Sequence, residues 1–332
     1  MNDLVIIAKK LVAEGKGVLA ADWGVGSIGT RFEKIGLENT PENRKRYREM
    51  LFGTLGLSEY ISGVIEFDET IRQGLAEVLK KNGIMPGIKV DKGLVDMANF
   101  PGEKVSEGLN GLRERLKEYV GMGAVFCKWR MVVTIGGELP TRACVETNAR
   151  AMAQYAALCQ EQGLVPIVEP EVLKEGDHTI EKAAEVTEET LRLVFEMLGD
   201  HKVKLEGMIL KSSMAVCSGT GCPVQANPEM VAEKTVEVLR RVVPPAVPGV
   251  VFLSGGQEAI EATINLNLIG QIRSLPWRLT FSYERALEEP TLFAWGGKDE
   301  NVEKAQKVLL HRAKMNSLAS LGKYTEEAEN EI

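Results

Sequence analysis

The chain has 332 residues, 44% of them hydrophobic and 26% charged, a composition typical of a folded globular protein. Its formal net charge of −7 argues against nucleic acid as a partner, because binding to a phosphate backbone needs a basic face. The sequence has no run of eighteen apolar residues, so neither a transmembrane helix nor a membrane partner is expected.

The first residues and the cysteines bear on the cellular compartment. Residues 1–11 form an amphipathic stretch without the apolar run and small-residue cleavage site of a signal peptide. The cysteines are odd in number and include no CxxC pair, so free thiols in a reducing compartment are expected; they are Cys127, Cys144, Cys159, Cys217 and Cys222. The sequence therefore predicts a cytoplasmic protein.

Short apolar runs alternate with helical patterns from about residue 17 to residue 284. The runs predict eight strands, at residues 17–23, 61–68, 85–91, 124–130, 164–171, 207–211, 249–256 and 278–283. Among the predicted helices are 69–82, stopped by Gly83, 187–198, stopped by Gly199, and 227–242, which Asn227 caps and Pro228 begins.

Strict alternation of strands and helices predicts a parallel sheet, and eight such units predict closure into a (β/α)8 TIM barrel. The alternative is an open doubly wound sheet, for which Gly24, Gly26 and Gly29 supply only a lone GxGxxG signal. We expect one domain over residues 1–332, with an N-terminal helix at 1–16, the barrel at 17–290 and a C-terminal helix and tail at 291–332. The acidic end, 325–332, is expected to be frayed.

Ionisable residues gather at the carboxyl ends of six predicted strands. In a barrel these ends open on one face, where active sites are built, and i, i+2 spacing puts both members of a pair on one side of a strand. A single pair could simply mark a strand emerging into water, but six strands together predict a charged pocket. The residues are Asp22, Glu66, Asp68, Lys89, Asp91, Lys128, Arg130, Glu169, Glu171 and Lys211.

Lys211 follows the apolar residues 208–210, so its amine is expected to rise from a buried strand into the charged mouth. A lysine must lose its proton to act as a nucleophile, and burial and a nearby cation both favour that loss. Lys128 lies on an alternate strand of the same predicted interior layer. Two lysines beside two carboxylates are what imine-forming catalysis requires, so we predict this chemistry.

A phosphate site is predicted after the seventh strand. Ser254, Gly255 and Gly256 precede a helix expected to begin near Gln257, whose N-terminus would offer free N–H groups to an anion, and Arg285 could add a bidentate contact. The same glycines would equally suit a plain strand-to-helix turn.

Metal chemistry is not indicated. The three histidines form no HxxxH or HxH array and none stands at a predicted strand end. No metal and no cofactor are expected.

Several segments together resemble the class I fructose-bisphosphate aldolases, over roughly residues 17–324. They are 87–93 (GIKVDKG), 128–130 (KWR), 165–171 (VPIVEPE), 205–211 (LEGMILK), 240–247 (RRVVPPAV), 252–257 (FLSGGQ), 279–283 (LTFSY) and 294–298 (AWGGK). The resemblance implies reversible cleavage of fructose 1,6-bisphosphate to dihydroxyacetone phosphate and glyceraldehyde 3-phosphate, through a lysine Schiff base and usually by a homotetramer.

The resemblance also implies a role for each site residue. Lys211 would be the Schiff-base lysine and Glu169 the general acid/base, with a pKa nearer the working pH than that of a free glutamate. Asp22 would contact substrate hydroxyls, Lys128 would stabilise developing charge, and Glu171 would hold the lysines. The implied substrate-binding residues are Lys89, Arg130, Ser254, Gly255, Gly256, Ser282, Arg285 and Ser27.

The chain departs from the family pattern at three positions. Trp23 begins a segment that in the family usually reads Glu-Ser-Thr-Gly-Ser, Thr30 replaces a basic residue, and Glu284 replaces a glycine whose N–H faces phosphate. We expect Glu284 to turn away and pair with a cation, Arg285 being nearest in sequence; otherwise it would weaken phosphate binding. Activity on another ketose phosphate, or a weakly catalytic scaffold role, remains an alternative reading.

Overall fold

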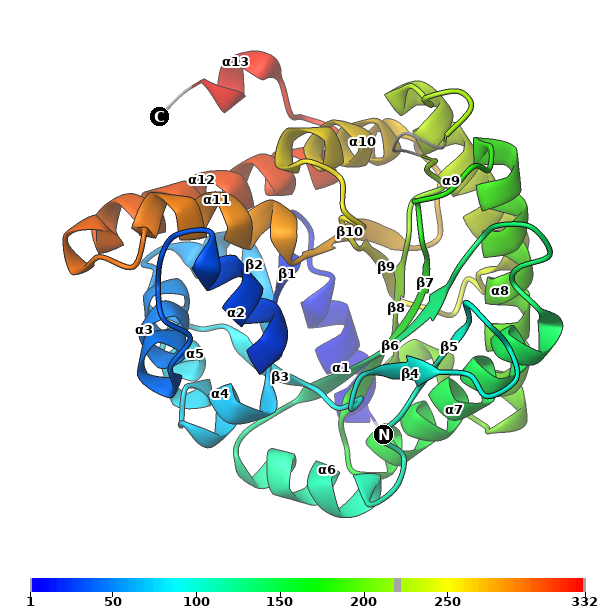
Figure 1. Cartoon of the computed structure of the whole chain (residues 1–332), viewed down its shortest axis with the longest axis horizontal. Helices are drawn as coiled ribbons and strands as arrows, with labels where there is room; N and C mark the ends of the chain where they lie inside the picture. The colour runs from blue at the N-terminus through cyan, green and yellow to red at the C-terminus, as the bar shows by residue number, and fades with distance from the viewer. Residues whose placement is uncertain (1, 218–221, 331–332) are drawn as a thin grey trace.

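The computed structural model describes residues 2–217 and 222–330. Eight parallel strands close into a barrel in the order β1-β10-β9-β8-β7-β6-β3-β2, and helices surround it (Figure 1). The predicted TIM barrel is therefore confirmed, and the open doubly wound sheet is wrong. A separate antiparallel pair, β4 (Leu94–Asp96) and β5 (Lys104–Ser106), was not predicted from the sequence.

All eight predicted strands are present with small shifts at their ends. The barrel strands are β1 (Gly17–Ala21), β2 (Ile61–Glu66), β3 (Met85–Lys89), β6 (Phe126–Val133), β7 (Val165–Val172), β8 (Ile209–Ser212), β9 (Gly249–Phe252) and β10 (Arg278–Tyr283). All eight are buried over most of their length because the helices cover their outer faces.

Helices and short 3₁₀ turns lie around and beside the barrel. The helices are α1 (Asn2–Leu11), α2 (Val25–Glu33), α3 (Pro41–Phe52), α4 (Asp68–Arg72), α5 (Ala76–Lys81), α6 (Leu112–Gly121), α7 (Arg142–Glu161), α8 (Ile180–Asp200), α9 (Pro228–Val242), α10 (Ala259–Gln271), α11 (Arg285–Trp295), α12 (Val302–Ser320) and α13 (Glu326–Glu329), and the 3₁₀ turns are η1 (Leu57–Glu59), η2 (Leu205–Gly207) and η3 (Asp299–Asn301).

The helices differ more from the predictions than the strands do. The single helix predicted at 69–82 is two helices, because Gly74 has a positive φ of 82° between α4 and α5. The helix predicted at 187–198 is the longer α8, and the α9 cap is as predicted, with Asn227 accepting from the Met230 N–H at 2.8 Å.

The amino end of the barrel is closed by α1, which crosses behind the strands in Figure 1. Leu4, Ala8 and Leu11 of this helix pack on interior residues of the strands, among them Phe126. A Cβ at residue 87 would lie 2.2 Å from the Phe126 ring, so only glycine fits there. The lower part of the barrel is thus filled with apolar side chains, and the charged residues are left to the carboxyl end.

The acidic end of the chain is ordered up to Asn330, so the prediction of a frayed segment is wrong for the described residues. Thr325 caps α13, accepting from the Ala328 N–H at 3.3 Å. Glu329 pairs with Arg312 of α12 and accepts a hydrogen bond from the Tyr324 hydroxyl at 2.9 Å. Residues 331–332 lie outside the described part.

Two of the five cysteines are not free. Cys217 and Cys222 form a disulfide, with their Cα atoms 5.8 Å apart, so the expectation of five free thiols is wrong for this pair. Cys127, Cys144 and Cys159 are free and buried. Sequence spacing does not predict the disulfide, because the approach of these two residues depends on the path of the loop after β8.

Within the described ranges, none of the helices combines the length and the apolar character needed to cross a membrane.

Candidate active site

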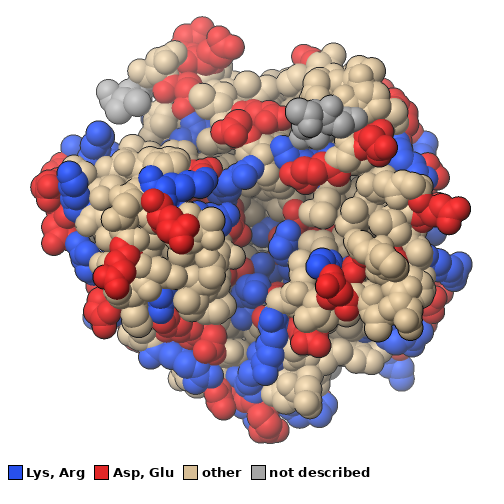
Figure 2. Space-filling model, in the orientation of Figure 1, with Lys and Arg blue, Asp and Glu red and all other residues tan. Residues whose placement is uncertain are grey.

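A hollow opens at the centre of the face where the barrel strands end, and basic side chains line much of it (Figure 2). The cavity has a volume of about 320 Å³, within the range of pockets for small molecules. It collects side chains from strand ends far apart in the sequence. Its lining residues are Asp22, Trp23, Ser27, Arg31, Lys89, Lys128, Arg130, Glu169, Glu171, Lys211, Leu253, Ser254, Gly255, Gly256, Ser282, Glu284 and Arg285. All thirteen predicted site residues are among them.

A chain of ion pairs runs across the floor of this pocket. The Lys128 Nζ atom lies 2.8 Å from Asp22 Oδ2 and 3.0 Å from Glu169 Oε2, and the Lys211 Nζ atom lies 2.9 Å from Glu169 Oε1. These four side chains come from β6, β7, β8 and the end of β1, and each is at most 4% exposed. Glu169 therefore bridges two lysine amines in a site nearly closed to water.

The charges in this chain stabilise one another. Burial by itself would lower the pKa of Lys128, but the carboxylates of Asp22 and Glu169 raise it above its ordinary value. Burial by itself would raise the pKa of Glu169, but Lys128 and Lys211 bring it below the ordinary value, and Asp22 is affected in the same way. The expectation that the pKa of Glu169 lies nearer the working pH is thus wrong for the unliganded pocket, because two cations hold the carboxylate ionised.

Two polar atoms on the pocket wall, Asp22 Oδ1 and Ser282 Oγ, are buried without a hydrogen bond to any residue that the structure describes. Glu169 Oε2 makes no hydrogen bond there either, but it is paired with the Lys128 ammonium at 3.0 Å. A buried polar atom left unpaired costs free energy, and a polyhydroxylated ligand would satisfy Asp22 Oδ1 and Ser282 Oγ.

A second layer of charges lies nearer the opening. Lys89 pairs with Asp91 at 3.0 Å, and Arg130 pairs with Glu171 through a short contact. The expected role of Glu171 in holding the lysines falls to Glu169 instead. Glu171 fixes the Arg130 guanidinium, and the buried carboxylate raises the pKa of that arginine although burial opposes it.

The predicted phosphate site has open backbone donors. Gly255 and Gly256 have positive φ angles of 53° and 79°, and their N–H groups have no partner within residues 2–217 and 222–330. A Cβ on residue 256 would lie 3.0 Å from Arg285 Nη2, so the guanidinium stands against this turn. The helix begins at Ala259 rather than near Gln257, and Glu261 accepts from the Glu258 N–H at 3.1 Å, so that donor is not available to an anion.

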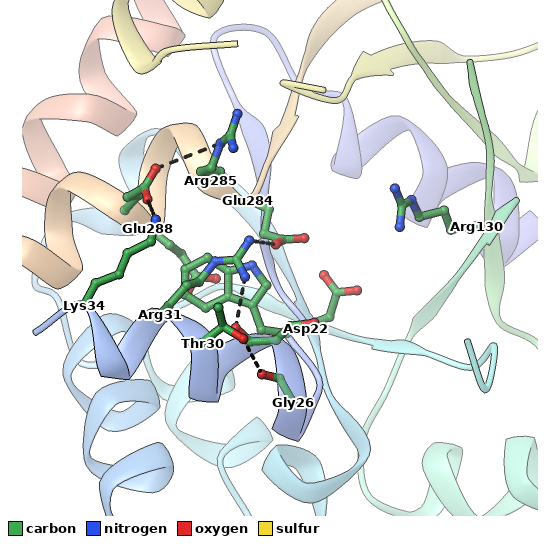
Figure 3. A network of polar contacts seen from close by, with 12 residues as sticks. Asp22, Gly26, Thr30, Arg31, Lys34, Arg130, Glu284, Arg285 and Glu288 are labelled. Carbon is green, nitrogen blue, oxygen red and sulfur yellow. Dashed lines mark hydrogen bonds and ion pairs between the residues drawn. The ribbon is translucent and has the colours of Figure 1, made fainter. Parts of the chain in front are cut away.

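The three positions that depart from the family pattern lie at or beside one corner of the pocket, where Figure 3 labels Thr30 and Glu284 near Arg31 and Trp23 lies under the Arg31 guanidinium. Arg31 lies 4.2 Å above the Trp23 ring, its Nη2 atom is 3.6 Å from Glu284 Oε1, and its Nη1 atom donates to the Ser27 carbonyl at 2.9 Å. Thr30 is exposed and bonds back to the Gly26 carbonyl at 3.2 Å, outside the pocket lining.

Sequence reasoning did not predict Arg31, which stands on α2 away from the strand ends. Its position four residues after Ser27 could have indicated that it faces the pocket, because residues four apart lie on the same face of a helix. Glu284 pairs with this arginine and faces the pocket, whereas it was expected to turn away towards Arg285.

Three of the predicted strand-end acids do not line the pocket: Asp91, which pairs with Lys89 of the lining, and Glu66 and Asp68, which lie elsewhere. Ile65 belongs to the barrel interior, so alternation along β2 turns Glu66 outwards into the layer between strands and helices. Burial raises the pKa of Glu66 to about 8. Asp68 lies on α4, where it pairs with Arg72 at 2.9 Å. Neither residue lines the pocket.

Among the described residues no three His, Cys, Asp or Glu side chains are grouped as metal ligands.

Comparison with known proteins gives one consistent family. The family model described as fructose-bisphosphate aldolase class-I matches residues 3–332. A fructose-bisphosphate aldolase of Dictyostelium discoideum is 51% identical, covering 98% of this chain and 94% of the relative, and "Fructose-bisphosphate aldolase 4, cytosolic" of Arabidopsis thaliana is 51% identical, covering 98% and 85%. The aldolase of Plasmodium falciparum, solved in a complex with TRAP and a small-molecule inhibitor, superposes with a TM-score of 0.95 at 49% identity, covering 98% of this chain and 95% of that one.

Proposed function

Since this chain belongs to the class I fructose-bisphosphate aldolase family and is a carbon–carbon lyase of that kind, we propose that its reaction proceeds through an imine on Lys211 with Glu169 as the proton carrier. The observation that supports this assignment is the position of Glu169, whose two carboxylate oxygens lie 2.9 Å from Lys211 and 3.0 Å from Lys128. The remaining residues are assigned from their place in the lining of the same pocket.

The first step joins substrate to enzyme. The Lys211 amine gives a proton to Glu169, at hydrogen-bond distance, and attacks the ketone carbon of the sugar. The carbonyl oxygen then leaves as water, taking one proton from the nitrogen side and one from the Glu169 carboxyl. Lys128, which its carboxylate neighbours keep protonated, stabilises negative charge on the departing oxygen.

The second step breaks the carbon–carbon bond. A carboxylate removes the proton of the hydroxyl two carbons from the imine, the bond between C3 and C4 opens, and its electron pair moves to the iminium nitrogen. The aldehyde leaves, the enamine is protonated at C3, and water hydrolyses the imine to return Lys211. Two carboxylates are near this position: Asp22, whose Oδ1 atom has no partner in the described residues, and Glu169, whose Oε2 atom lies 3.0 Å from Lys128 Nζ. Ser254, Gly255, Gly256 and Arg285 bind phosphate, and Ser27, Ser282, Lys89 and Arg130 line the remaining wall.

Borohydride trapping tests the assignment. Reduction in the presence of dihydroxyacetone phosphate is expected to fix the ligand mass on the peptide containing Lys211, and EDTA is expected to leave activity unchanged. An adduct on a different lysine, or activity lost to the chelator and restored by a metal, would refute the mechanism.

We further propose that residues 1–332 act as one domain, that the chain is cytoplasmic, and that it assembles as a homotetramer. The tetramer rests on the family resemblance and is tested by sedimentation equilibrium. The Cys217–Cys222 disulfide means that free thiols no longer support a cytoplasmic location. The support comes instead from the cytosolic Arabidopsis relative. Cell fractionation tests the location.

A further inference from the structure

Most cations of the pocket are already paired with a carboxylate. The distances are 2.8 Å for Lys128, 2.9 Å for Lys211, 3.0 Å for Lys89 and 3.6 Å for Arg31, and Arg130 makes a short pair with Glu171. Arg285 differs from these cations, because its carboxylate partner, Glu289, lies outside the pocket lining and is 3.9 Å away. Within the described residues, Arg285 is therefore the pocket cation least neutralised before a ligand arrives.

Arg285 lies beside backbone donors that suit one phosphate. Arg285 stands against Gly256, whose N–H and that of Gly255 are unpartnered in the described part of the chain, and Ser254 completes the turn. One side of the pocket therefore offers a guanidinium and backbone donors to an anion, and only the 3.9 Å pair of Arg285 with Glu289 competes for them.

The corner of Trp23, Arg31 and Glu284 is built differently. Arg31 is held on three sides, by the Trp23 ring, the Ser27 carbonyl and the Glu284 carboxylate, and its Nε atom is buried without a partner in the described residues. Thr30 brings no second cation, since its hydroxyl bonds to the Gly26 carbonyl. A ligand at this corner meets one positive and one negative side chain, with no net charge between them (Figure 3).

We propose that Glu284 is a specificity-determining residue: by neutralising Arg31 it weakens the binding of a second phosphate, so that this enzyme also cleaves ketose monophosphates at little disadvantage to the bisphosphate. The inference rests on the proposed function, because it presumes a sugar bound as an imine on Lys211. A phosphate that binds at the corner must break the Arg31–Glu284 ion pair, and its negative charge is repelled by the Glu284 carboxylate. An uncharged terminal hydroxyl does neither.

The test compares kcat/KM for fructose 1,6-bisphosphate and fructose 1-phosphate in the full-length chain. The ratio of the two values is expected to be below about thirtyfold in the wild-type enzyme. In Glu284→Gln, which keeps the shape of the side chain, the ratio is expected to rise about tenfold, which corresponds to about 1.4 kcal/mol. Glu300→Gln is the matched control: this exposed acid outside the pocket has no ion-pair partner in the part of the chain that the structure describes, and its replacement changes the net charge equally.

The measured ratios of kcat/KM decide whether Glu284 sets the substrate preference. A wild-type ratio above about thirtyfold, or a rise of less than about threefold in both Glu284→Gln and Glu284→Gly, overturns the inference. Circular dichroism establishes that each variant is folded, and the glycine variant serves if the glutamine variant is not. If borohydride leaves no adduct on Lys211 with either substrate, the proposed function fails; an adduct together with an unchanged ratio removes the inference about Glu284 alone.

Discussion

The floor of the pocket and its corner use the same kinds of side chain in different ways. On the floor, Lys128, Glu169 and Lys211 are at most 4% exposed and their charged atoms lie 2.9–3.0 Å apart. At the corner, the Arg31 and Glu284 side chains are 23% and 36% exposed and their atoms are 3.6 Å apart. A fully buried charge loses its partner only at a large cost in free energy, whereas the partly exposed Arg31–Glu284 pair can exchange its partner for a ligand. We therefore expect the charges on the floor to determine the reaction, and the Arg31–Glu284 pair at the corner to determine which substrates are preferred.

The largest effect is expected from the floor. Lys211→Arg is expected to lower kcat by a factor on the order of 10⁴ or more, because arginine stays protonated and cannot form the imine. A coupled assay of dihydroxyacetone phosphate formation measures the loss. The control is Lys304→Arg on the exposed face of α12, which should retain full activity. Residual turnover above about 1% in Lys211→Arg would mean that another residue forms the covalent bond.

Glu169→Gln is expected to lower kcat by about 10²–10⁴-fold with a smaller change in KM, since it removes a proton carrier. Glu171→Gln supplies the contrast, because Glu171 pairs with Arg130 at the opening. Its main effect should be a higher KM. If both variants changed kcat and KM in the same way, the proposal that Glu169 acts in the chemical step and Glu171 in binding would be wrong.

The two regions should respond differently to pH. Burial, and after it the Asp22 carboxylate, raise the pKa of Glu284 to about 7, although Lys128, Arg31 and Lys211 lower it; Arg130 also faces this carboxylate. Below that pH Glu284 is neutral and Arg31 is released; above it the carboxylate is charged and holds Arg31. The preference for fructose 1,6-bisphosphate over fructose 1-phosphate should therefore fall, by up to roughly tenfold, as pH rises from about 6 to 8.

Glu284→Gln is the control for this profile, since substrate phosphates titrate near pH 6 in both enzymes. The substrate preference of the variant should vary less with pH than that of the wild type. Identical profiles would show that the titration belongs to the substrate.

The smallest effect is expected from the ring beneath Arg31. Trp23→Leu removes a cation–π contact of about 0.5–1 kcal/mol, so KM for the bisphosphate should rise about two- to fivefold as Arg31 loses its fixed position. Trp23→Phe keeps an aromatic face and should change KM less. Equal effects of the two substitutions would point to the volume of this buried residue and not to its interaction with Arg31.

The sequence predicted the barrel because its strands are buried on both faces and read as apolar runs separated by helices. It predicted the floor because Asp22, Lys128, Glu169 and Lys211 each end such a run. The same rule failed for Glu66, since one residue of alternation decides which side of the sheet a side chain occupies.

Contacts that depend on the course of a loop or on tertiary packing were not predictable. Arg31 meets Glu284 across more than 250 positions of sequence, and a bend at Gly74 divides a segment whose periodicity is continuous. The Glu329–Arg312 pair, which orders the acidic end, likewise depends on how α12 and the last residues pack. Local pattern thus locates the strand ends, while the partners of each charge come from the closed fold.

The closure of the barrel has a consequence for synthesis of the chain. Strand β1 pairs with β10, and the Thr280 hydroxyl donates to the Lys16 carbonyl 264 residues earlier. At about 5–20 residues per second, the first strand waits roughly 13–50 seconds on the ribosome before its partner is made. During that interval one edge of β1 and the apolar face of α1 are open, a template for pairing with other chains. We therefore expect the unfinished chain to be most prone to aggregation before the last strand emerges.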